Sequence, residues 1–183
     1  MNEDDKSERR KTRLVIAEDE TMTREMLARL LSLEDDIEVV GTAADGQKAL
    51  NVVRIQKPDV LLTDIGMPQV NGIELTETLR REMPQVGVVI LTIYNDDERV
   101  FAAIKAGARG YVLKDSAPED TIAAVRAVGR GEALLNPLLV GRVLAEFTRL
   151  TIQRAADTAV FAPVHGSKKW AEGARTSSVV RKC

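Results

Sequence analysis

The chain alternates short apolar runs with longer segments in which apolar residues recur every three or four positions. The runs have the length of β-strands, and the segments have the periodicity of amphipathic helices. Repeated strand–helix alternation builds a parallel sheet, because right-handed crossovers place the connecting helices on both of its faces. The sequence therefore predicts a doubly wound α/β fold with a five-stranded parallel sheet in the order 2-1-3-4-5.

Proline and glycine residues set several of the expected boundaries. Prolines follow the second and third helical segments and a glycine follows the fourth, and neither residue continues a helix readily. A proline also stands at the start of the fifth segment, where it is favoured. The expected strands cover residues 14–17, 37–43, 60–63, 86–93 and 110–113. The expected helices cover residues 21–33, 46–56, 72–83, 96–106 and 118–129.

Polar side chains stand where four of the apolar runs end. They are Glu18 and Asp19 after the first run, Asp64 after the third, Thr92 after the fourth and Lys114 after the fifth. The carboxyl ends of parallel strands meet at one edge of the sheet, where ligands bind in open α/β folds. Clustered carboxylates raise one another's pKa unless a cation is present. Mg²⁺ is a hard cation that takes few protein carboxylates, so we expect one magnesium site at this edge.

The stretch Leu61-Leu-Thr-Asp-Ile-Gly-Met-Pro-Gln-Val-Asn-Gly-Ile-Glu74 resembles the phosphoacceptor strand and following loop of receiver domains from two-component response regulators. The resemblance extends over roughly residues 13–130, and it implies a flavodoxin-like fold. It identifies Asp64 as the phosphoacceptor. It also implies that Glu18, Asp19 and Asp64 hold Mg²⁺ together with the backbone carbonyl of Gly66.

Three further residues match positions with defined roles in this family. Thr92 matches the switch hydroxyl, Lys114 the lysine that pairs with the phosphoryl group, and Tyr111 the aromatic residue that rotates. A carboxylate nucleophile needs its own charge and that of the phosphodonor neutralised, and a divalent cation can bridge both sets of oxygens. Drawing Thr92 inward is expected to let Tyr111 turn inward, which changes the neighbouring surface.

The expected phosphodonor is a separate sensor histidine kinase. No Walker-type phosphate-binding loop occurs in the chain, so direct use of ATP is not expected. The receiver is expected to catalyse only its own phosphorylation and dephosphorylation, and not to be an enzyme for other substrates.

Each of these residues also has an ordinary explanation when it is considered alone. An acidic pair before a helix compensates the helix dipole, Asp64 could be a turn residue before Gly66 and Pro68, and Lys114 could be solvated. Their joint occurrence at successive strand ends favours the receiver interpretation. The turn after the first strand is acidic where dinucleotide-binding folds have glycines. Gly66 stands where an aspartyl-phosphate hydrolase has a second aspartate.

Composition indicates a cytoplasmic protein without a membrane segment. The only cysteine is Cys183, which excludes an internal disulfide and is typical of a reducing compartment. No apolar run has the length of a membrane span, and the first residues have neither the basic nor the apolar region of a signal peptide. Residues 1–12 are expected to form a flexible charged tail.

The segment after the receiver domain, which is expected to occupy 13–131, is harder to interpret. Tyr111-Val-Leu-Lys-Asp-Ser116 resembles the LuxR-type (NarL/FixJ-like) subclass, whose members continue through a linker into a helix-turn-helix domain. An apolar stripe predicts a linker helix within 132–150. Residues 151–183 carry six Lys or Arg against two Asp or Glu and show no recognisable helix pair, so we expect an irregular basic tail there.

The origin of this tail is open between three explanations. Codons from Ile152 onward, read one nucleotide later, would permit a sequence like the start of the family's output domain, which makes a scrambled output domain one explanation. A divergent tail and a vector-derived sequence are the others.

Three functions remain open from the sequence. The first is a transcriptional response regulator that is phosphorylated on Asp64, forms a phosphorylation-dependent homodimer and binds DNA only through a C-terminal domain not recognisable in this chain. The second is a stand-alone receiver that acts by protein contact or phosphorelay. The third and weakest is a metal-dependent phosphatase.

Overall fold

The computed structural model describes residues 10–135 and 137–160 of the chain. Its strands pair in parallel to form one six-stranded sheet in the order β2-β1-β3-β4-β5-β6. The doubly wound α/β fold and the order of the first five strands are thus confirmed. The strands are β1 (Thr12–Ala17), β2 (Ile37–Ala43), β3 (Val60–Thr63), β4 (Gly87–Thr92), β5 (Gly110–Leu113) and β6 (Leu134–Leu135).

The sixth strand was not predicted. It contains two residues and pairs with β5, where Gly110 lies opposite Leu134. A two-residue strand is too short to show a hydrophobic period in the sequence, so it could not be predicted from that pattern. Its assignment as a strand rests on its pairing with β5.

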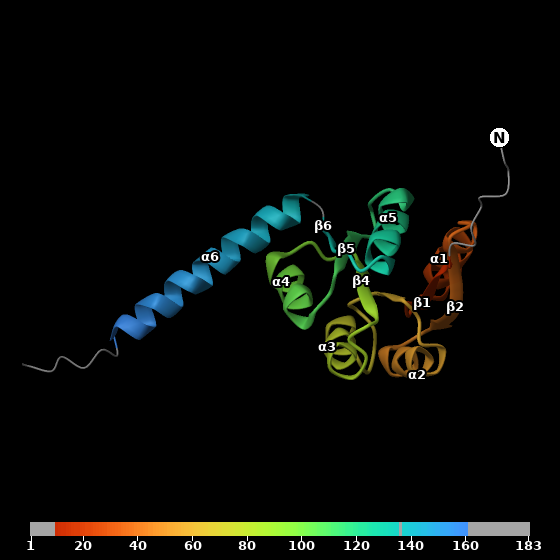
Figure 1. Cartoon of the computed structure of the whole chain (residues 1–183), viewed down its shortest axis with the longest axis horizontal. Coiled ribbons are helices and arrows are strands. Elements are labelled where there is room, and N and C mark those ends of the chain that lie inside the picture. The colour runs from red at the N-terminus through yellow and green to blue at the C-terminus, as the bar shows by residue number, and fades with distance from the viewer. Residues whose placement is uncertain (1–9, 136, 161–183) are drawn as a thin grey trace, which may run out of the picture. The chain divides into compact units, whose positions relative to one another are not determined.

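Helices cover both faces of the sheet. Figure 1 shows α1 and α5 on one face and α2, α3 and α4 on the other. Two separate clusters of buried apolar side chains fill the space between these layers and the sheet. The helices are α1 (Thr21–Ser32), α2 (Gly46–Gln56), α3 (Gly72–Glu82), α4 (Asp97–Ala106), α5 (Pro118–Gly129) and α6 (Pro137–Val160).

Local capping signals explain the ends of the helices that support the site. The Asn71 side chain accepts hydrogen bonds from the Ile73 and Glu74 amides, and Glu74 bonds back to the Asn71 amide, so α3 begins in a capping box. Asp96 caps α4 through the Arg99 amide. At the other end of α4, Gly107 has a φ of 113°, a left-handed conformation that glycine adopts readily.

The last described helix is longer than expected. The linker helix was predicted to end by residue 150, with an irregular tail from 151, but α6 continues to Val160. That boundary was wrong because the segment after Leu150 contains Ala155, Ala156 and Ala159, and alanine has the highest helix propensity. The remainder of the expected tail, residues 161–183, and most of the expected N-terminal tail, residues 1–9, lie outside the described residues.

The chain divides into two units that meet between Thr148 and Arg149. In the first unit, the start of α6 packs on the core: Leu139 is buried, Val143 lies against the same cluster, and the Phe147 ring contacts that of Phe101 on α4 edge-on at 5.3 Å between centroids. No helix among the described residues is long and apolar enough to cross a membrane.

Candidate functional site

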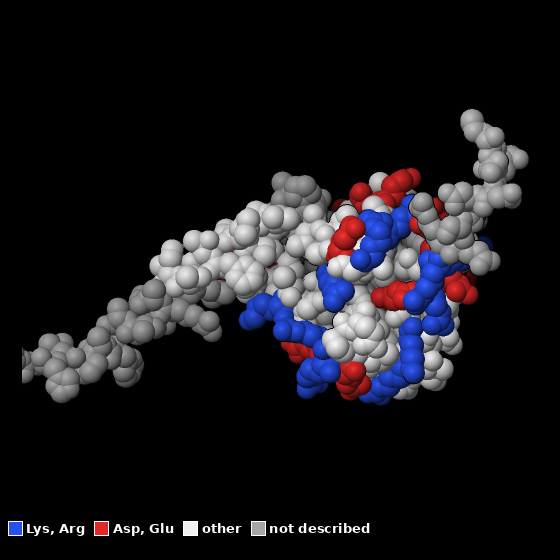
Figure 2. All heavy atoms as spheres, in the orientation of Figure 1, with Lys and Arg blue, Asp and Glu red and all other residues white. Residues whose placement is uncertain are grey.

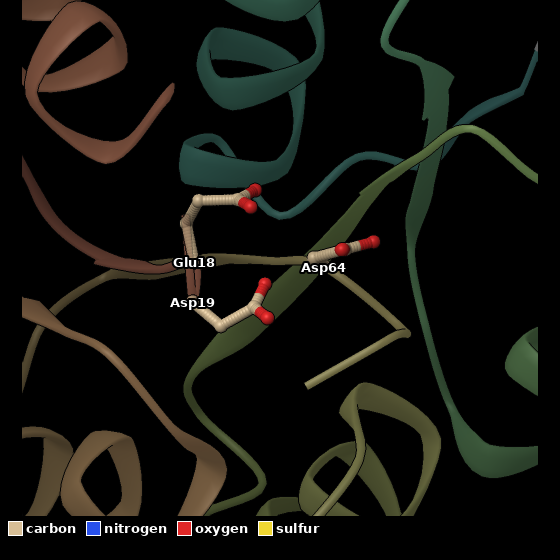
Figure 3. Close-up of side chains that lie close together, drawn as sticks. All are labelled: Glu18, Asp19 and Asp64. Atoms are coloured by element: carbon tan, nitrogen blue, oxygen red, sulfur yellow. The ribbon is translucent and has the colours of Figure 1, made fainter. Parts of the chain in front are cut away.

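Three carboxylates meet at the carboxyl edge of the sheet. β1 and β3 are neighbours in register, with Ala17 opposite Thr63, so Glu18 and Asp19 leave one strand beside Asp64, which leaves the other. Figure 3 shows the Glu18 and Asp19 carboxyl groups reaching from the end of β1 toward Asp64. One oxygen from each of the three lies within 4.8 Å of the others. The predicted convergence of these side chains is therefore present.

Lys114 joins the cluster from the end of β5. Its Nζ lies 2.7 Å from Glu18 Oε2 and 3.1 Å from Asp64 Oδ2. The Lys114 amide also donates to the Thr92 carbonyl at 2.9 Å, which fixes where the side chain leaves the backbone. The lysine places one positive charge among the carboxylates.

Burial sets the electrostatics of this group. Only 2% of Glu18 is exposed; burial raises its pKa and the Asp64 charge raises it further, while Lys114 counteracts both. Burial acts to lower the pKa of Lys114, but its hydrogen bonds to Glu18 and Asp64 outweigh that effect and raise it. Lys114 is therefore protonated at neutral pH, and this one lysine pairs with two of the three carboxylates.

Backbone contacts hold the acidic residues in place. The Asp64 amide donates to the Ala17 carbonyl at 3.0 Å. The Ile65 amide donates to Asp64 Oδ1 at 2.7 Å, which leaves Oδ2 on the side of Lys114. Arg24 on α1 donates through one guanidinium nitrogen to the carbonyls of Glu18, at 2.6 Å, and Asp19, at 3.2 Å.

The hydroxyl groups of Thr92 and Tyr111 both form hydrogen bonds with the backbone of Tyr94. The Tyr94 backbone lies between them: its amide donates to Thr92 Oγ1 at 3.4 Å, and its carbonyl accepts from Tyr111 Oη at 2.7 Å. Tyr111 is buried, with 1% of its surface exposed, and its movement on phosphorylation stays a prediction. The Tyr111 hydroxyl donates to the Tyr94 carbonyl, so burial of the ring leaves this hydroxyl with a hydrogen-bond partner.

Replacing Tyr111 with Phe is expected to lower the free energy of unfolding at neutral pH by about 1 kcal/mol, because one hydrogen bond to the backbone is lost. The variant should also lose less stability in alkali. Burial raises the pKa of Tyr111 above its usual 10.0, so the folded state keeps the phenol proton while the unfolded state releases it, and stability falls as pH rises above that value. Urea unfolding near neutrality and at about pH 11 measures both effects. An equal alkaline loss in both proteins would contradict this origin.

Sequence reasoning missed Arg24, Tyr94 and Arg99 near the site. The Arg99–Asp96 pair has the i, i+3 spacing of a helix and could have been read from the sequence. The Arg24 contacts with the Glu18 and Asp19 carbonyls and the Arg99 contact with the Tyr94 ring depend on the paths of the loops before α1 and α4. Tyr94 lies two residues beyond Thr92, so its closeness to Thr92 could be predicted from the sequence, but its hydrogen bonds could not. Gly66 follows Asp64 by two residues, and the role of its carbonyl remains a prediction.

A sequence model of the response regulator receiver domain matches residues 14–126. The chain belongs to this family, which consists of signalling proteins. Its flavodoxin-like fold and the LuxR-type resemblance are borne out by solved structures. These include a LuxR-family two-component response regulator from Aurantimonas sp. SI85-9A1 (28% identity, TM-score 0.70, covering 75% of this chain and 99% of that one). A LuxR-family DNA-binding response regulator from Staphylococcus aureus is also similar (28% identity, TM-score 0.62, covering 64% and 98%).

Curated relatives are longer regulatory proteins. The transcriptional regulatory protein DegU of Brevibacillus brevis is 39% identical over 140 residues, covering 76% of this chain and 59% of DegU. The oxygen regulatory protein NreC of Staphylococcus carnosus is 38% identical over 147 residues, covering 80% of this chain and 68% of NreC. The chain thus spans about two thirds or less of the length of these relatives.

Proposed function

We propose that this chain is a phosphorylation-activated switch in which Asp64 accepts a phosphoryl group from the phosphohistidine of a sensor kinase. The observation that carries the proposal is the position of Asp64 Oδ2. This oxygen lies 3.1 Å from Lys114 Nζ, beside two further carboxylates, while the other oxygen is held by the Ile65 amide. One carboxylate oxygen is thus oriented toward a cation that can pair with the incoming phosphoryl oxygens.

The transfer of the phosphoryl group needs only the phosphodonor, Asp64 and a proton from solvent. An Asp64 oxygen forms the new bond to phosphorus, and the bond between phosphorus and the imidazole nitrogen of the donor breaks. The bonding electrons leave with that nitrogen, which takes up a proton from solvent. The aspartyl phosphate carries added negative charge, to which Lys114 can pair and Thr92 can donate.

The acidic cluster fits a magnesium ion. All three side chains offer hard oxygen ligands within 4.8 Å of one another, and Lys114 supplies only one positive charge to this cluster. Glu18, Asp19 and Asp64 would hold the ion, with the Gly66 carbonyl as a further ligand. When bound, Mg²⁺ would neutralise charge on the carboxylates and on the phosphoryl oxygens.

The output would pass through Thr92, Tyr94 and Tyr111. A Thr92 hydroxyl drawn toward the phosphoryl group would give up the bond from the Tyr94 amide, and the Tyr94 carbonyl is bonded to Tyr111. The surface near α4 would change as a result. We propose that this change promotes a homodimer. The names of the relatives favour transcriptional control, and a stand-alone signalling role is the second candidate.

Phosphorylation is tested by incubating the protein with acetyl phosphate and Mg²⁺ and measuring its intact mass. A gain of about 80 Da, one phosphoryl group, is expected, and EDTA should abolish it. Peptide mapping should place the group on the peptide that contains Asp64. An adduct that forms equally in EDTA, or maps elsewhere, would contradict the proposal.

Replacing Asp19 with Asn is expected to weaken Mg²⁺ binding at least about tenfold, because it removes a charged oxygen ligand. Thr92→Ala should leave Mg²⁺ binding nearly unchanged, since the hydroxyl is assigned to the phosphoryl group and not to the ion. Titration of Mg²⁺ followed by NMR measures both affinities. Equal losses in the two variants would show that the metal lies elsewhere.

Binding to DNA by this chain is expected to be unspecific and sensitive to salt. Basic and acidic side chains are interspersed on the face shown in Figure 2, so that face offers no surface of a single sign. Residues 151–183 carry six Lys or Arg, and contacts from such residues to phosphates weaken steeply with salt. A gel-shift titration with unrelated duplexes at two salt concentrations should give equal affinities. Salt-tolerant retention of one sequence would contradict this expectation.

A further inference from the structure

Arg24 occupies a position at which a positive charge is unfavourable. It is the fourth residue of α1, and its side chain reaches back past the start of the helix to the Glu18 and Asp19 carbonyls. The N-terminus of a helix carries a partial positive charge that repels a guanidinium. No carboxylate within residues 10–135 and 137–160 forms an ion pair with Arg24 to offset this repulsion. Its hydrogen bonds to the chain that precedes α1 are therefore the contacts that stabilise it there.

Three hydrogen bonds tie the Arg24 guanidinium to the turn between β1 and α1. One nitrogen donates to the Glu18 carbonyl at 2.6 Å and to the Asp19 carbonyl at 3.2 Å. The other terminal nitrogen donates to Thr21 Oγ1 at 3.2 Å, so the planar group is fixed at both ends. Figure 3 shows the carboxylates of Glu18 and Asp19 pointing toward Asp64. Arg24 thus restrains the backbone from which both carboxylates extend.

Asp19 depends on this restraint more than Glu18 does. The Glu18 side chain is buried and pairs with Lys114 Nζ at 2.7 Å, so it has contacts of its own. The Asp19 side chain is exposed, and it forms no hydrogen bond with the described part of the chain. Its direction is therefore set by the backbone of the turn, where Arg24 donates to the Asp19 carbonyl.

A restrained turn affects two common divalent cations differently. Mg²⁺ requires near-ideal octahedral geometry at short distances, whereas Ca²⁺ accepts longer distances, more ligands and a flexible geometry. A carboxylate on a restrained backbone loses little freedom when it is placed at the distance that Mg²⁺ needs. The same carboxylate on a loose turn can still bind Ca²⁺. Loosening the turn is therefore expected to reduce the affinity for Mg²⁺ first.

We propose that Arg24 is a positioning residue that makes the acidic cluster selective for Mg²⁺ over Ca²⁺ by restraining the turn that contains Glu18 and Asp19. This inference rests on the proposed metal site formed by these two residues and Asp64. Charge and position have opposite effects at Arg24. Its positive charge, added to that of Lys114, opposes the binding of any cation, so removing the charge alone would strengthen the binding of both ions. Loosening the turn would weaken binding, and more for Mg²⁺ than for Ca²⁺.

The test compares the affinities of the chain for Mg²⁺ alone and for Ca²⁺ alone, each measured by an NMR titration. Arg24→Met keeps an unbranched side chain but removes all the donors, and it should weaken Mg²⁺ binding at least about fivefold and Ca²⁺ binding less than about twofold. Arg24→Lys keeps the charge but loses the planar fork, so it should weaken Mg²⁺ binding about threefold. Arg29→Met is the control, since Arg29 is an exposed arginine on the same helix. It should bind both ions as the original protein does.

A second measurement needs no metal. Amide hydrogen exchange at residues 18–20 should be faster in metal-free Arg24→Met than in the original protein, because the turn has lost the hydrogen bonds from the guanidinium. The Arg29→Met control should show the exchange rates of the original protein. Unchanged exchange in Arg24→Met would overturn the restraint of the turn by Arg24.

The sign of the change in affinity separates the explanations. Tighter binding of both ions by Arg24→Met would overturn the proposal, because the lost charge alone would explain it. A parallel loss for the two ions, or unchanged affinities, would also overturn it. Arg24→Lys decides the same question if the methionine variant does not fold. Failure of the original protein to bind Mg²⁺ would instead overturn the proposed metal site, and this inference with it.

Discussion

Replacing Asp64 with Asn is expected to abolish phosphorylation of the chain by acetyl phosphate. The amide has nearly the shape of the carboxylate, but it lacks the negative oxygen that forms the bond to phosphorus. It also removes one of three carboxylates from the candidate metal cluster. Intact mass after incubation with donor and Mg²⁺ should therefore show no adduct in the variant, under conditions in which the original protein gains one.

Asp115→Asn provides a matched control for this substitution. Asp115 is an exposed carboxylate directly after Lys114, and it is not among the residues that form the acidic cluster. Its variant should gain the adduct to the same extent as the original protein. An adduct that persists in Asp64→Asn and is lost in Asp115→Asn would show that the acceptor is Asp115 and not Asp64.

The acidic cluster could be predicted because it depends on topology. Once β1 and β3 are placed as parallel neighbours, residues that directly follow them must share one edge of the sheet, and Glu18 and Asp64 do so. The same argument brings Lys114 to that edge from β5. No knowledge of side-chain packing is needed for these placements.

The Tyr94 contacts could not be predicted in the same way. They depend on the path of the loop between β4 and α4, which brings one residue between the Thr92 and Tyr111 hydroxyls. The stacking of Arg99 on the ring further requires that Asp96 cap α4, so that Arg99 falls in the first turn of the helix. The end of α6 was missed for another reason, since alanine favours helix without contributing an apolar stripe of its own.

Gly72 shows how closely the fold is built around Asp64. α3 begins directly behind Asp64, where the Gly72 amide donates to the Ile65 carbonyl at 3.1 Å. A Cβ at Gly72 would lie 2.1 Å from the carbonyl oxygen of Asp64 and 2.9 Å from its carbonyl carbon. These are backbone atoms of the chain segment that presents the carboxylate, so they cannot move aside as a flexible side chain would.

Gly72→Ala is therefore expected to lower the free energy of unfolding by about 3 kcal/mol, because α3 and the end of β3 must separate to admit the methyl group. Any folded fraction should also be phosphorylated more slowly, since the displacement reaches the backbone of Asp64. Gly141→Ala is the control: its methyl would meet no atom within 4 Å, and in α6 it should be neutral or stabilise by up to about 1 kcal/mol. Urea unfolding measures both variants. Equal stability of the two would mean that α3 can shift without cost, and that Asp64 is less firmly held than its contacts indicate.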